Sequence, residues 1–391
     1  MDASFDAVVL GLGAMGSAAA YQLARRGVRV LGIDQFSPPH VYGSTHGDTR
    51  ITRQAIGEGE EYTPLSLRSY ELWREIERET GKELLTVTGG LIISSPTKLS
   101  HHHVSNFFER TVAVAAKYGI PHTLLDAPQI RRRFPQFSVR DAEVGYYEPD
   151  AGFLRPEECV RAQLALAEKS GARLALGERA TGFSADRGRG VTVRTDRGEY
   201  AAASLVLSAG PWLPRLLGPE GEQVFTVSRQ VMYWFDVNGT VAPFLPERFP
   251  VFIWEVPDRP QVIYGFPAVD GPGGGVKVAS EQYETSTTPD TVSREVTGAE
   301  VRAMYETYVA PYLRGLGNRC IKAMACLYTV TPDFGFVIDA HPNYPQVIIA
   351  SPCSGHGFKH SAALGEVLAQ LVVDGKSTID VSRFTLRRFV N

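Results

Sequence analysis

The sequence predicts an α/β protein in which a Rossmann-type domain is interleaved with a second domain built on a mixed, largely antiparallel sheet. Strand–turn–helix patterns typical of a doubly wound parallel sheet occur at the start, the middle and the end of the chain. Between them, residues 217–324 contain stretches such as TVSRQVMYWFDV, where apolar and polar residues alternate as in a half-covered strand. A chain of 391 residues that is 43% hydrophobic can fill two such cores.

The strongest local pattern lies at the start of the chain. DAVVLG at 6–11 predicts a buried parallel strand, and GLGAMG places Gly11, Gly13 and Gly16 at the G-x-G-x-x-G spacing. Gly11 allows a tight turn, Gly13 lets the backbone approach a pyrophosphate, and Gly16 lets helix and strand pack closely. The positive end of the helix dipole would face the same pyrophosphate.

The next helix is expected to run through SAAAYQLARRG and to end at Gly27 in a left-handed cap. Residues 18–20 and Leu23 are expected to face the sheet, whereas Gln22 faces water. The second strand, VRVLGID, ends at Asp34, 18 residues after Gly16, where a carboxylate can bind an adenosine ribose. The order of these elements predicts a βαβ nucleotide site, which FAD, NAD or NADP could each occupy.

Two further junctions complete the predicted sheet. Residues 205–207 form a buried strand that Gly210 turns into a helix, and FGFVID and QVIIAS precede a long amphipathic helix near the C-terminus. Leu364, Val367, Leu368 and Leu371 form the buried side of that helix. We expect residues 1–85, 146–216 and 325–391 to form the nucleotide-binding domain, and residues 86–145 and 217–324 to form the substrate domain.

Charge and composition exclude several classes of partner. The net charge of -3 and the pI near 6.3 disfavour nucleic acid and anionic membranes. The start, MDASFDAVVLGLG, is acidic where a signal peptide is basic, and no stretch approaches the roughly 20 apolar residues of a membrane span. We therefore expect a cytoplasmic protein.

The cysteines and histidines do not predict a metal site. The four cysteines show no C-x-x-C spacing, so neither a zinc site nor a disulfide framework is expected. His101, His102 and His103 are adjacent, and adjacent histidines point in different directions on a helix. We therefore interpret the three histidines as the solvated start of a helix.

The segment after Asp34 is a loop that carries charged side chains. Its prolines and glycines in QFSPPHVYGSTHGDTR forbid a long regular element. His46, Arg50 and Arg53 lie close together in the sequence, and the two arginines share one side if ITRQ begins a helix. Taken alone, this cluster fits either a solvated basic face or a binding site.

At this point the chain resembles the monomeric sarcosine oxidase family of FAD-dependent amine oxidases, which includes N-methyltryptophan oxidase and pipecolate oxidase and has the D-amino-acid-oxidase-like fold. The resemblance covers nearly the whole length. The motifs that carry it are GLGAMG, HGDTRITR at 46–53, EVP and YGFP at 255–267, GVK at 275–277, ACLYTVTPD at 325–333 and SGHGFK at 354–359.

The resemblance implies FAD as cofactor, covalently attached through one cysteine. In this family the cysteine of the CxYTxTxD segment is bonded to the 8α-methyl carbon of the isoalloxazine ring, and here that residue is Cys326. Cys320 and Cys353 do not match the motif. The turn that would cradle the pyrimidine end of the flavin contains Gly355, His356, Gly357 and Phe358.

The resemblance also implies roles for the charged and aromatic residues. Arg53 and Lys359 match the residues that bind the substrate carboxylate, and a forked guanidinium and an ammonium suit that task. Lys277 matches the lysine that activates O₂, where a fixed positive charge stabilises the developing anion. The remaining matches are Arg50 and His46 beside the flavin, and Tyr264 and Tyr328 along the substrate cavity.

One position departs from the family pattern. Where sarcosine oxidase has a histidine four residues after the oxygen-activating lysine, this chain has Glu281. If Glu281 faces the cavity, its carboxylate would disfavour a second substrate carboxylate and favour a cation or hydroxyl near the amine. A solvent-facing Glu281 is the other interpretation, and the sequence does not decide between them.

The expected function is oxidation of a small secondary-amine amino acid, N-methyl or cyclic and sarcosine-like, by a monomeric oxidase that uses O₂. The imine product hydrolyses to an aldehyde and an amine, and hydrogen peroxide is released. An alternative is oxidation of a larger or primary amino acid or amine that carries an extra positive or hydroxyl group. Two other classes compete with this interpretation. A nicotinamide-dependent dehydrogenase shares the first βαβ unit but does not explain the later matched segments, and a flavin-binding protein without turnover would leave Arg53, Lys277 and Lys359 without a role.

Overall fold

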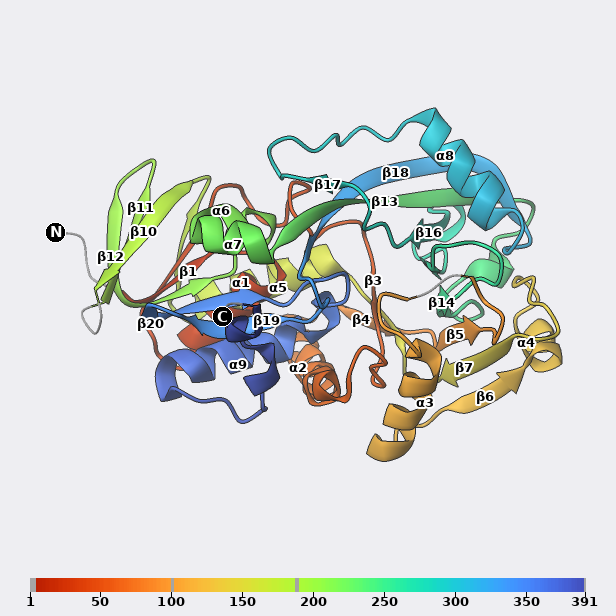
Figure 1. Cartoon of the computed structure of the whole chain (residues 1–391), viewed down its shortest axis with the longest axis horizontal. Helices are drawn as coiled ribbons and strands as arrows, with labels where there is room; N and C mark the ends of the chain where they lie inside the picture. Colours follow the sequence, from red (N-terminus) through yellow and green to blue (C-terminus); the bar gives the residue numbers. More distant parts are fainter. Residues whose placement is uncertain (1–4, 100–101, 187–189, 390–391) are drawn as a thin grey trace.

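The computed structural model describes residues 5–99, 102–186 and 190–389, and within these ranges it contains three sheets (Figure 1). The first sheet has eight strands. They are β1 (Phe5–Leu10), β2 (Val30–Asp34), β9 (Arg173–Leu176), β10 (Ala180–Asp186), β11 (Gly190–Thr195), β12 (Glu199–Leu207), β19 (Val337–His341) and β20 (Tyr344–Ser351).

The centre of the first sheet is parallel. β1 pairs in parallel with β2 and with β12, and β12 pairs in parallel with β20. The register places Val8 beside Leu31 on one side and Leu205 on the other. The carboxyl ends of these strands therefore share one edge of the sheet, where open α/β sheets bind their ligands.

Helices from distant parts of the chain cover the first sheet (Figure 1). The helices of the described residues are α1 (Ala14–Arg25), α2 (Thr63–Thr80), α3 (Phe107–Tyr118), α4 (Ala127–Arg133), α5 (Pro156–Lys169), α6 (Leu213–Leu217), α7 (Pro219–Val224), α8 (Gly298–Met304) and α9 (Ser361–Asp374). Side chains of α1, α2, α5 and α9 form one apolar core with the sheet, while α6 and α7 lie on its other face. None of these helices combines the length and apolarity that a membrane span requires.

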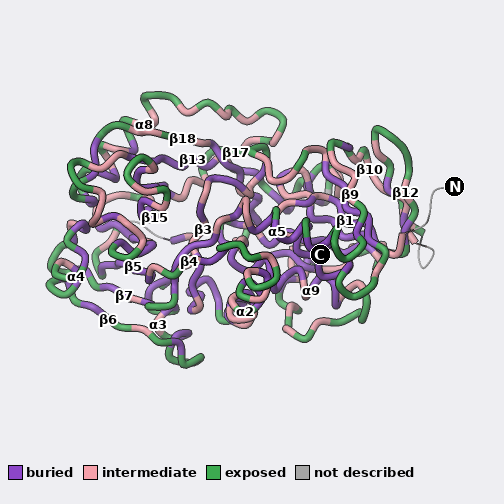
Figure 2. The backbone as a smooth tube through the Cα atoms, turned by 180° about the vertical axis from the view of Figure 1, so that it is seen from behind, coloured by how far each residue is buried: buried purple, intermediate pink, exposed green. Residues whose placement is uncertain are grey.

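Helix α1 begins and ends close to the predicted positions, and Gly27 has the expected positive φ of 79°. The prediction for Gln22 is wrong, because this side chain is only 4% exposed. Both α5 and α9 pack against α1, so this helix has no broad face toward water. Figure 2 shows the resulting buried backbone in the region of α5 and β1.

The second sheet is mixed and largely antiparallel, as the sequence predicts. Its strands are β5 (Gly90–Ser94), β6 (Thr123–Asp126), β7 (Val144–Glu148), β13 (Thr226–Val237), β14 (Val251–Trp254), β15 (Ile263–Phe266), β16 (Val276–Ser280), β17 (Ser286–Thr287) and β18 (Leu316–Val330). Only β5 and β14 pair in parallel among these described strands. β7 and β18 run a few residues past the domain boundaries expected from the sequence, and those boundaries remain a prediction.

A small third sheet lies between the two large ones in both views (Figures 1 and 2). It consists of β3 (Arg50–Thr52), β8 (Gly152–Leu154) and β4 (Leu85–Val87). Residues 50–52 therefore form a strand and do not begin a helix. Arg50 and Arg53 are nonetheless brought together at the junction of the large sheets, because the short strand β3 fixes the backbone between them.

Candidate active site

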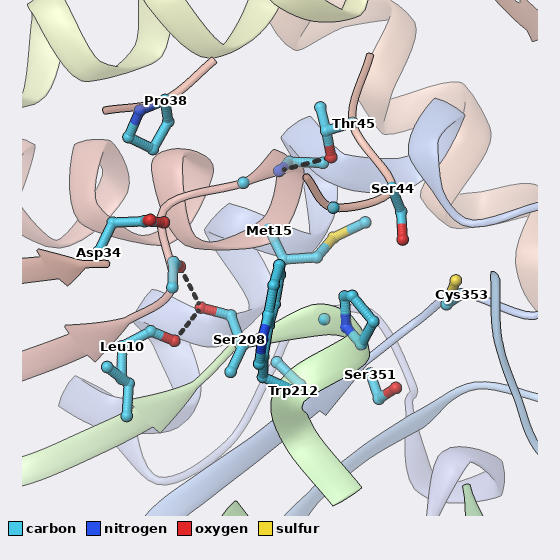
Figure 3. A pocket seen from close by; sticks show the side chains of 18 of the residues that line it. Leu10, Met15, Asp34, Pro38, Ser44, Thr45, Ser208, Trp212, Ser351 and Cys353 are labelled. Atoms are coloured by element: carbon cyan, nitrogen blue, oxygen red, sulfur yellow. Dashed lines mark hydrogen bonds between the residues drawn. The ribbon is translucent and has the colours of Figure 1, made fainter. Parts of the chain in front are cut away.

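A cavity of about 500 Å³ opens at the carboxyl edge of the first sheet (Figure 3). The turns after β1, β2, β12 and β20 contribute its walls, as strand order at this edge requires. Ser208 closes one side by donating from Oγ to the carbonyl oxygens of Leu10 (3.2 Å) and Gly11 (2.8 Å). The cavity follows these turns, and its wall includes both Asp34 at the end of β2 and Phe358 in the turn before α9.

The three motif glycines differ in their surroundings. Gly11 has a φ of 89°, and a Cβ there would lie 2.6 Å from the carbonyl oxygen of Ser208. A Cβ on Gly16 would lie 1.7 Å from the carbonyl oxygen of Gly11, so helix and turn touch at this point. At Gly13 the nearest atom to such a Cβ is Oγ1 of Thr45 at 3.5 Å, which leaves the backbone open toward the cavity.

Asp34 lies at the end of β2 and borders the cavity (Figure 3). Its Oδ2 accepts from the amide of Leu12 (2.8 Å) and its Oδ1 from the amide of Phe36 (2.9 Å). Burial raises the pKa of Asp34, and these two amide donors oppose the shift. Each carboxylate oxygen keeps a lone pair for a further donor in the cavity.

A second, smaller cavity of about 80 Å³ adjoins the first. Arg50, Tyr328, Gly355 and Phe358 border both. The other sequence-predicted residues that border the smaller cavity are Arg53, Tyr264, Lys277, Glu281, His356 and Lys359. Gly357 borders the larger cavity, whereas His46 and Cys326 lie just behind the cavity walls.

Lys277 is buried on β16 with every ammonium proton directed at an oxygen. Nζ donates to the carbonyl oxygens of Gly47 (2.7 Å) and Thr49 (2.8 Å) and to Oγ1 of Thr49 (3.0 Å). Burial and the charge of Arg50 lower the pKa of Lys277 well below its ordinary value. The three oxygens stabilise the charged form of Lys277 and fix the position of its ammonium group. Because its pKa is lowered, the charge of Lys277 depends on pH.

Arg53 is 4% exposed and forms an ion pair that the sequence analysis missed. Its Nη2 lies 2.5 Å from Oε2 of Glu58, and its Nη1 donates to the carbonyl oxygen of Ala55. Nε has no hydrogen-bond partner among the described residues. Nε is therefore a donor of Arg53 that no described residue uses. Glu58 gave no sequence signal, because it lies in the ordinary acidic run GEGEE.

Lys359 completes this buried charge cluster. Its Nζ donates to the carbonyl oxygen of His356 (2.6 Å) and lies 3.9 Å from Oε1 of Glu58. Burial lowers the pKa of Lys359 to about 7, although Glu58 acts in the opposite direction. Burial alone would raise the pKa of Glu58, but Arg53 and Lys359 hold it well below the usual range. Two cations thus share one carboxylate, leaving a net positive site.

The remaining predicted residues lie close to these cations. The hydroxyl groups of Tyr264 and Tyr328 are 3.2 Å apart, and burial raises the pKa of Tyr264 to about 12. His46 is 1% exposed, and burial lowers its pKa to about 3, so the ring is neutral. His46 and Arg53 are buried and Arg50 is half-buried in the walls of both cavities, so the solvated-face interpretation of the two arginines is wrong.

Two cysteines lie near the cavities. Sγ of Cys326 is 3.5 Å from the carbonyl oxygen of Ser44 and 3.7 Å from Nη2 of Arg50, and both of these residues border the larger cavity. Cys353 borders the larger cavity itself (Figure 3), and its Sγ accepts from the amide of Thr329 at 3.3 Å. Burial raises the pKa of both thiols. The sequence motif and the cavity wall therefore point to different cysteines.

Glu281 faces the smaller cavity, and the solvent-facing interpretation is wrong. Its Oε1 lies 3.5 Å from Nε2 of His102, and its Oε2 lies 3.3 Å from Nδ1 of His103. The side chains of His102 and His103 are only 3% and 1% exposed, so they are not a solvated helix start. His101 lies outside the described residues. Helix α3 begins later, at Phe107, whose ring stacks on His102.

The turn before α9 has little space for larger residues. A Cβ on Gly357 would lie 1.6 Å from the carbonyl oxygen of Pro352, and Gly355 has a φ of 86°. Nε2 of His356 lies 3.0 Å from the carbonyl oxygen of Phe334, and burial lowers the pKa of His356 to about 3. This turn places Cys353 in the wall of the larger cavity and Lys359 in the wall of the smaller one, and Gly355 and Phe358 between them border both.

Comparisons with known proteins agree with this geometry. Residues 6–371 match the family model DAO, described as FAD dependent oxidoreductase. A monomeric sarcosine oxidase of Streptomyces avermitilis is 43% identical over 99% of this chain and 98% of that protein. An N-methyl-L-tryptophan oxidase of Yersinia pestis is 35% identical over 98% and 99%, respectively. The solved structure of NikD, an amino acid oxidase of nikkomycin biosynthesis, has the same fold, with a TM-score of 0.84 at 24% identity over 98% of this chain and 97% of NikD.

Proposed function

Because the chain belongs to the DAO family of FAD-dependent oxidoreductases, we propose that it oxidises a small secondary-amine amino acid, N-methyl or cyclic, with O₂ as electron acceptor. The observation that carries this proposal is the pair of buried cations, Arg53 and Lys359, in a cavity of about 80 Å³ beside a much longer one. A small carboxylate fits such a site, because buried cations bind carboxylates through strong charge-assisted hydrogen bonds.

The larger cavity fits FAD. The backbone at Gly13 is open toward this cavity. The cavity lies at the N-terminus of the twelve-residue helix α1 and extends to the carboxylate of Asp34. These are the features that hold a pyrophosphate and a ribose in Rossmann-type sites. We propose that Gly11, Gly13, Gly16 and Asp34 hold the nucleotide half. The turn formed by Gly355, His356, Gly357 and Phe358 would then hold the flavin half.

When bound, FAD supplies a two-electron acceptor for the carbon–hydrogen bond next to the substrate nitrogen. Arg53 and Lys359 hold the substrate carboxylate, and Tyr264 and Tyr328 enclose the amine end. The substrate becomes an imine, which water hydrolyses to an amine and a carbonyl compound, and for an N-methyl amino acid the carbonyl compound is formaldehyde. O₂ takes up the two electrons and leaves as hydrogen peroxide.

The basic side chains around the two cavities set the electrostatic potential inside them. Arg50 donates from its two Nη atoms to the carbonyl oxygens of Thr49 and Ser44, both at 2.8 Å, so its position is fixed. Lys277 is a second fixed cation, and neutral His46 packs behind them. We propose that Lys277 and Arg50 stabilise negative charge that develops near the cofactor, since preorganised charges act strongly in a dry site.

The substrate class is tested by anaerobic titration of the purified yellow protein. Sarcosine, N-methyltryptophan, pipecolate or proline is expected to bleach the visible flavin absorption, and admission of air restores it with release of hydrogen peroxide. Primary amino acids serve as the matched comparison. A colourless protein that reduces a nicotinamide cofactor, or a yellow one that no amine bleaches, would overturn the proposal.

We also propose that FAD is covalently attached through Cys326. Acid precipitation of the wild-type protein is expected to carry the yellow colour into the pellet, whereas Cys326→Ser releases it to the supernatant. Cys353→Ser is the matched control, because Cys353 borders the larger cavity and lacks the motif. Release from Cys353→Ser alone would assign the bond to Cys353, and release from the wild type would mean that no covalent bond forms.

The names of the relatives support a monomeric state, which size-exclusion chromatography tests directly.

A further inference from the structure

Glu281 is the one carboxylate in the wall of the smaller cavity, as far as the chain is described, that has no lysine or arginine bonded to it. Glu58, the other carboxylate in that wall, is bonded to Arg53. The backbone places Glu281 immediately after β16, where its amide donates to the carbonyl oxygen of Val262 at 3.1 Å. Lys277 lies on the same strand, four residues earlier, so the two opposite charges enter the cavity from one rigid element.

The imidazoles of His102 and His103 hold the Glu281 carboxylate in place. The amide of Val104 donates to Nδ1 of His102 (3.4 Å), which leaves the ring proton on Nε2, the atom that faces Glu281. Nδ1 of His103 faces the other carboxylate oxygen and also lies 3.3 Å from the hydroxyl group of Tyr283. Burial lowers the pKa of His102 to about 3, so this ring contributes a hydrogen bond without contributing a charge.

The two imidazoles orient the Glu281 carboxylate, and no lysine or arginine of the described chain forms an ion pair with it. An ionised carboxylate offers about four acceptor positions, and the two imidazoles occupy two of them at long distances. Lys277 and Arg50 differ from Glu281 in this respect, since the donors of Lys277 and the Nη atoms of Arg50 already bind oxygens of the chain. A donor that reaches Glu281 is expected to come from a molecule in the cavity.

We propose that Glu281, held by His102 and His103, is a second substrate subsite that selects amino acids with a positively charged group beyond the carboxylate and rejects those with a second anion. This inference rests on the proposed amine oxidation and names its substrate class more closely. Arg53 and Lys359 hold the carboxylate, and Glu281 accepts a donor from another group of the same molecule in the same cavity. A hydroxyl group would be accepted less well, because opposite charges attract more strongly in a buried site.

A metal ion is the competing occupant of this cluster. The ligand atoms of His102, His103 and Glu281 lie within 4.8 Å of one another. A metal on Nε2 of His102 would need the ring proton on Nδ1, where it would oppose the Val104 amide that donates to that atom. The hydrogen bonds present therefore favour a donor ligand over a metal.

The test compares substrates that differ only in the charge of their second group. One pair is N-(2-aminoethyl)glycine and iminodiacetate, and the other is N-methyl-2,3-diaminopropionate and N-methylaspartate. Wild-type protein is expected to favour the cationic member of at least one pair in kcat/KM. Glu281→Gln is expected to lower that preference by about tenfold to a hundredfold, the range for a charge-assisted hydrogen bond. Glu281→Lys should favour the anionic member.

Glu284→Gln is the matched control, because Glu284 is exposed and only three residues away. Sarcosine oxidation is followed in every variant, so a loss of all amine oxidation would contradict the proposed function rather than the subsite. If the wild type and Glu281→Gln both oxidise sarcosine with equal charge preference in both pairs, the subsite proposal is wrong. Stoichiometric metal in the purified wild type that Glu281→Gln lacks would likewise replace the subsite with a metal centre.

Discussion

Replacing Lys277 with methionine is expected to slow the reaction of the reduced enzyme with O₂ by about a hundredfold to a thousandfold, the usual cost of removing one preorganised charge or donor from a reacting anion. The rate at which substrate reduces the enzyme should stay within a few-fold of wild type. Lys277 is fixed by Gly47 and Thr49, so its charge needs no reorganisation when O₂ accepts electrons. Stopped-flow measurement of the two half-reactions separates these effects.

The control for this substitution is Lys322, which lies two strands away in the same sheet, on β18. Trp234 on β13 pairs with Lys277 on one side and with Lys322 on the other. The two ammonium groups lie 5.3 Å and 4.7 Å from its ring, but Lys322 is 41% exposed and binds Asp48. Lys322→Met should therefore leave reoxidation nearly unchanged. Equal slowing in both variants would show that general electrostatics, rather than Lys277, controls the step.

Protonation gives an independent check on Lys277. Because burial lowers its pKa, the cation is lost as the pH rises through a value well below that of an ordinary lysine. Reoxidation of the wild type is expected to slow over that rise, and Lys277→Met should lack this decline. The substitution also removes the ammonium hydrogen bonds to the carbonyl oxygens of Gly47 and Thr49, at about 0.5–1.5 kcal/mol for each lost bond. The oxygens themselves keep a donor, because the Thr49 amide binds the first and the Arg50 guanidinium binds the second. A modestly lower melting temperature is therefore expected alongside the kinetic change.

Local sequence patterns predicted the parts of the fold that depend on neighbouring residues. The turn at Gly11, the close packing at Gly16 and the strand ending at Asp34 follow from the order of strand, glycines and helix. The burial of Gln22 did not follow, because it depends on α5 and α9, which lie far along the chain.

The same limit applies to the candidate site. Glu58 carries no motif in the sequence, and only the approach of Arg53 and Lys359 shows that it is buried between cations. His102 and His103 looked like a helix start, but the segment before α3 turns their rings toward Glu281. Residues with a distinctive motif were found from sequence, whereas their ion-pair partners required the tertiary structure.

Replacing either of the two cations that we assign to the substrate carboxylate should lower activity strongly, and this loss can be measured separately from any loss of stability. Lys359→Gln is expected to lower kcat/KM for sarcosine by about tenfold to a hundredfold, because a hydrogen bond to a charged group contributes about 1.5–3 kcal/mol. Arg53→Gln should cost at least as much activity. It should also destabilise the fold, since removing one partner of a buried ion pair costs about 3–5 kcal/mol.

A double variant distinguishes binding from folding. Arg53→Gln combined with Glu58→Gln removes the uncompensated carboxylate, so the melting temperature is expected to recover while kcat/KM stays low. Recovery of both would mean that Arg53 serves only to neutralise Glu58. Arg68→Gln is a suitable control, because Arg68 is an ion-paired arginine near the surface of α2.

The pH dependence of carboxylate binding isolates Lys359. Acetate carries no amine, so its dissociation constant reports the state of the cavity cations without the titration of a substrate nitrogen. With the pKa of Lys359 near 7 in the free protein, the ammonium is present below that pH and is lost above it. Acetate is therefore expected to bind more weakly as the pH rises through about 7, and Lys359→Gln should bind it weakly at every pH. A wild-type affinity that stays constant across this range would mean that the carboxylate depends on Arg53 alone.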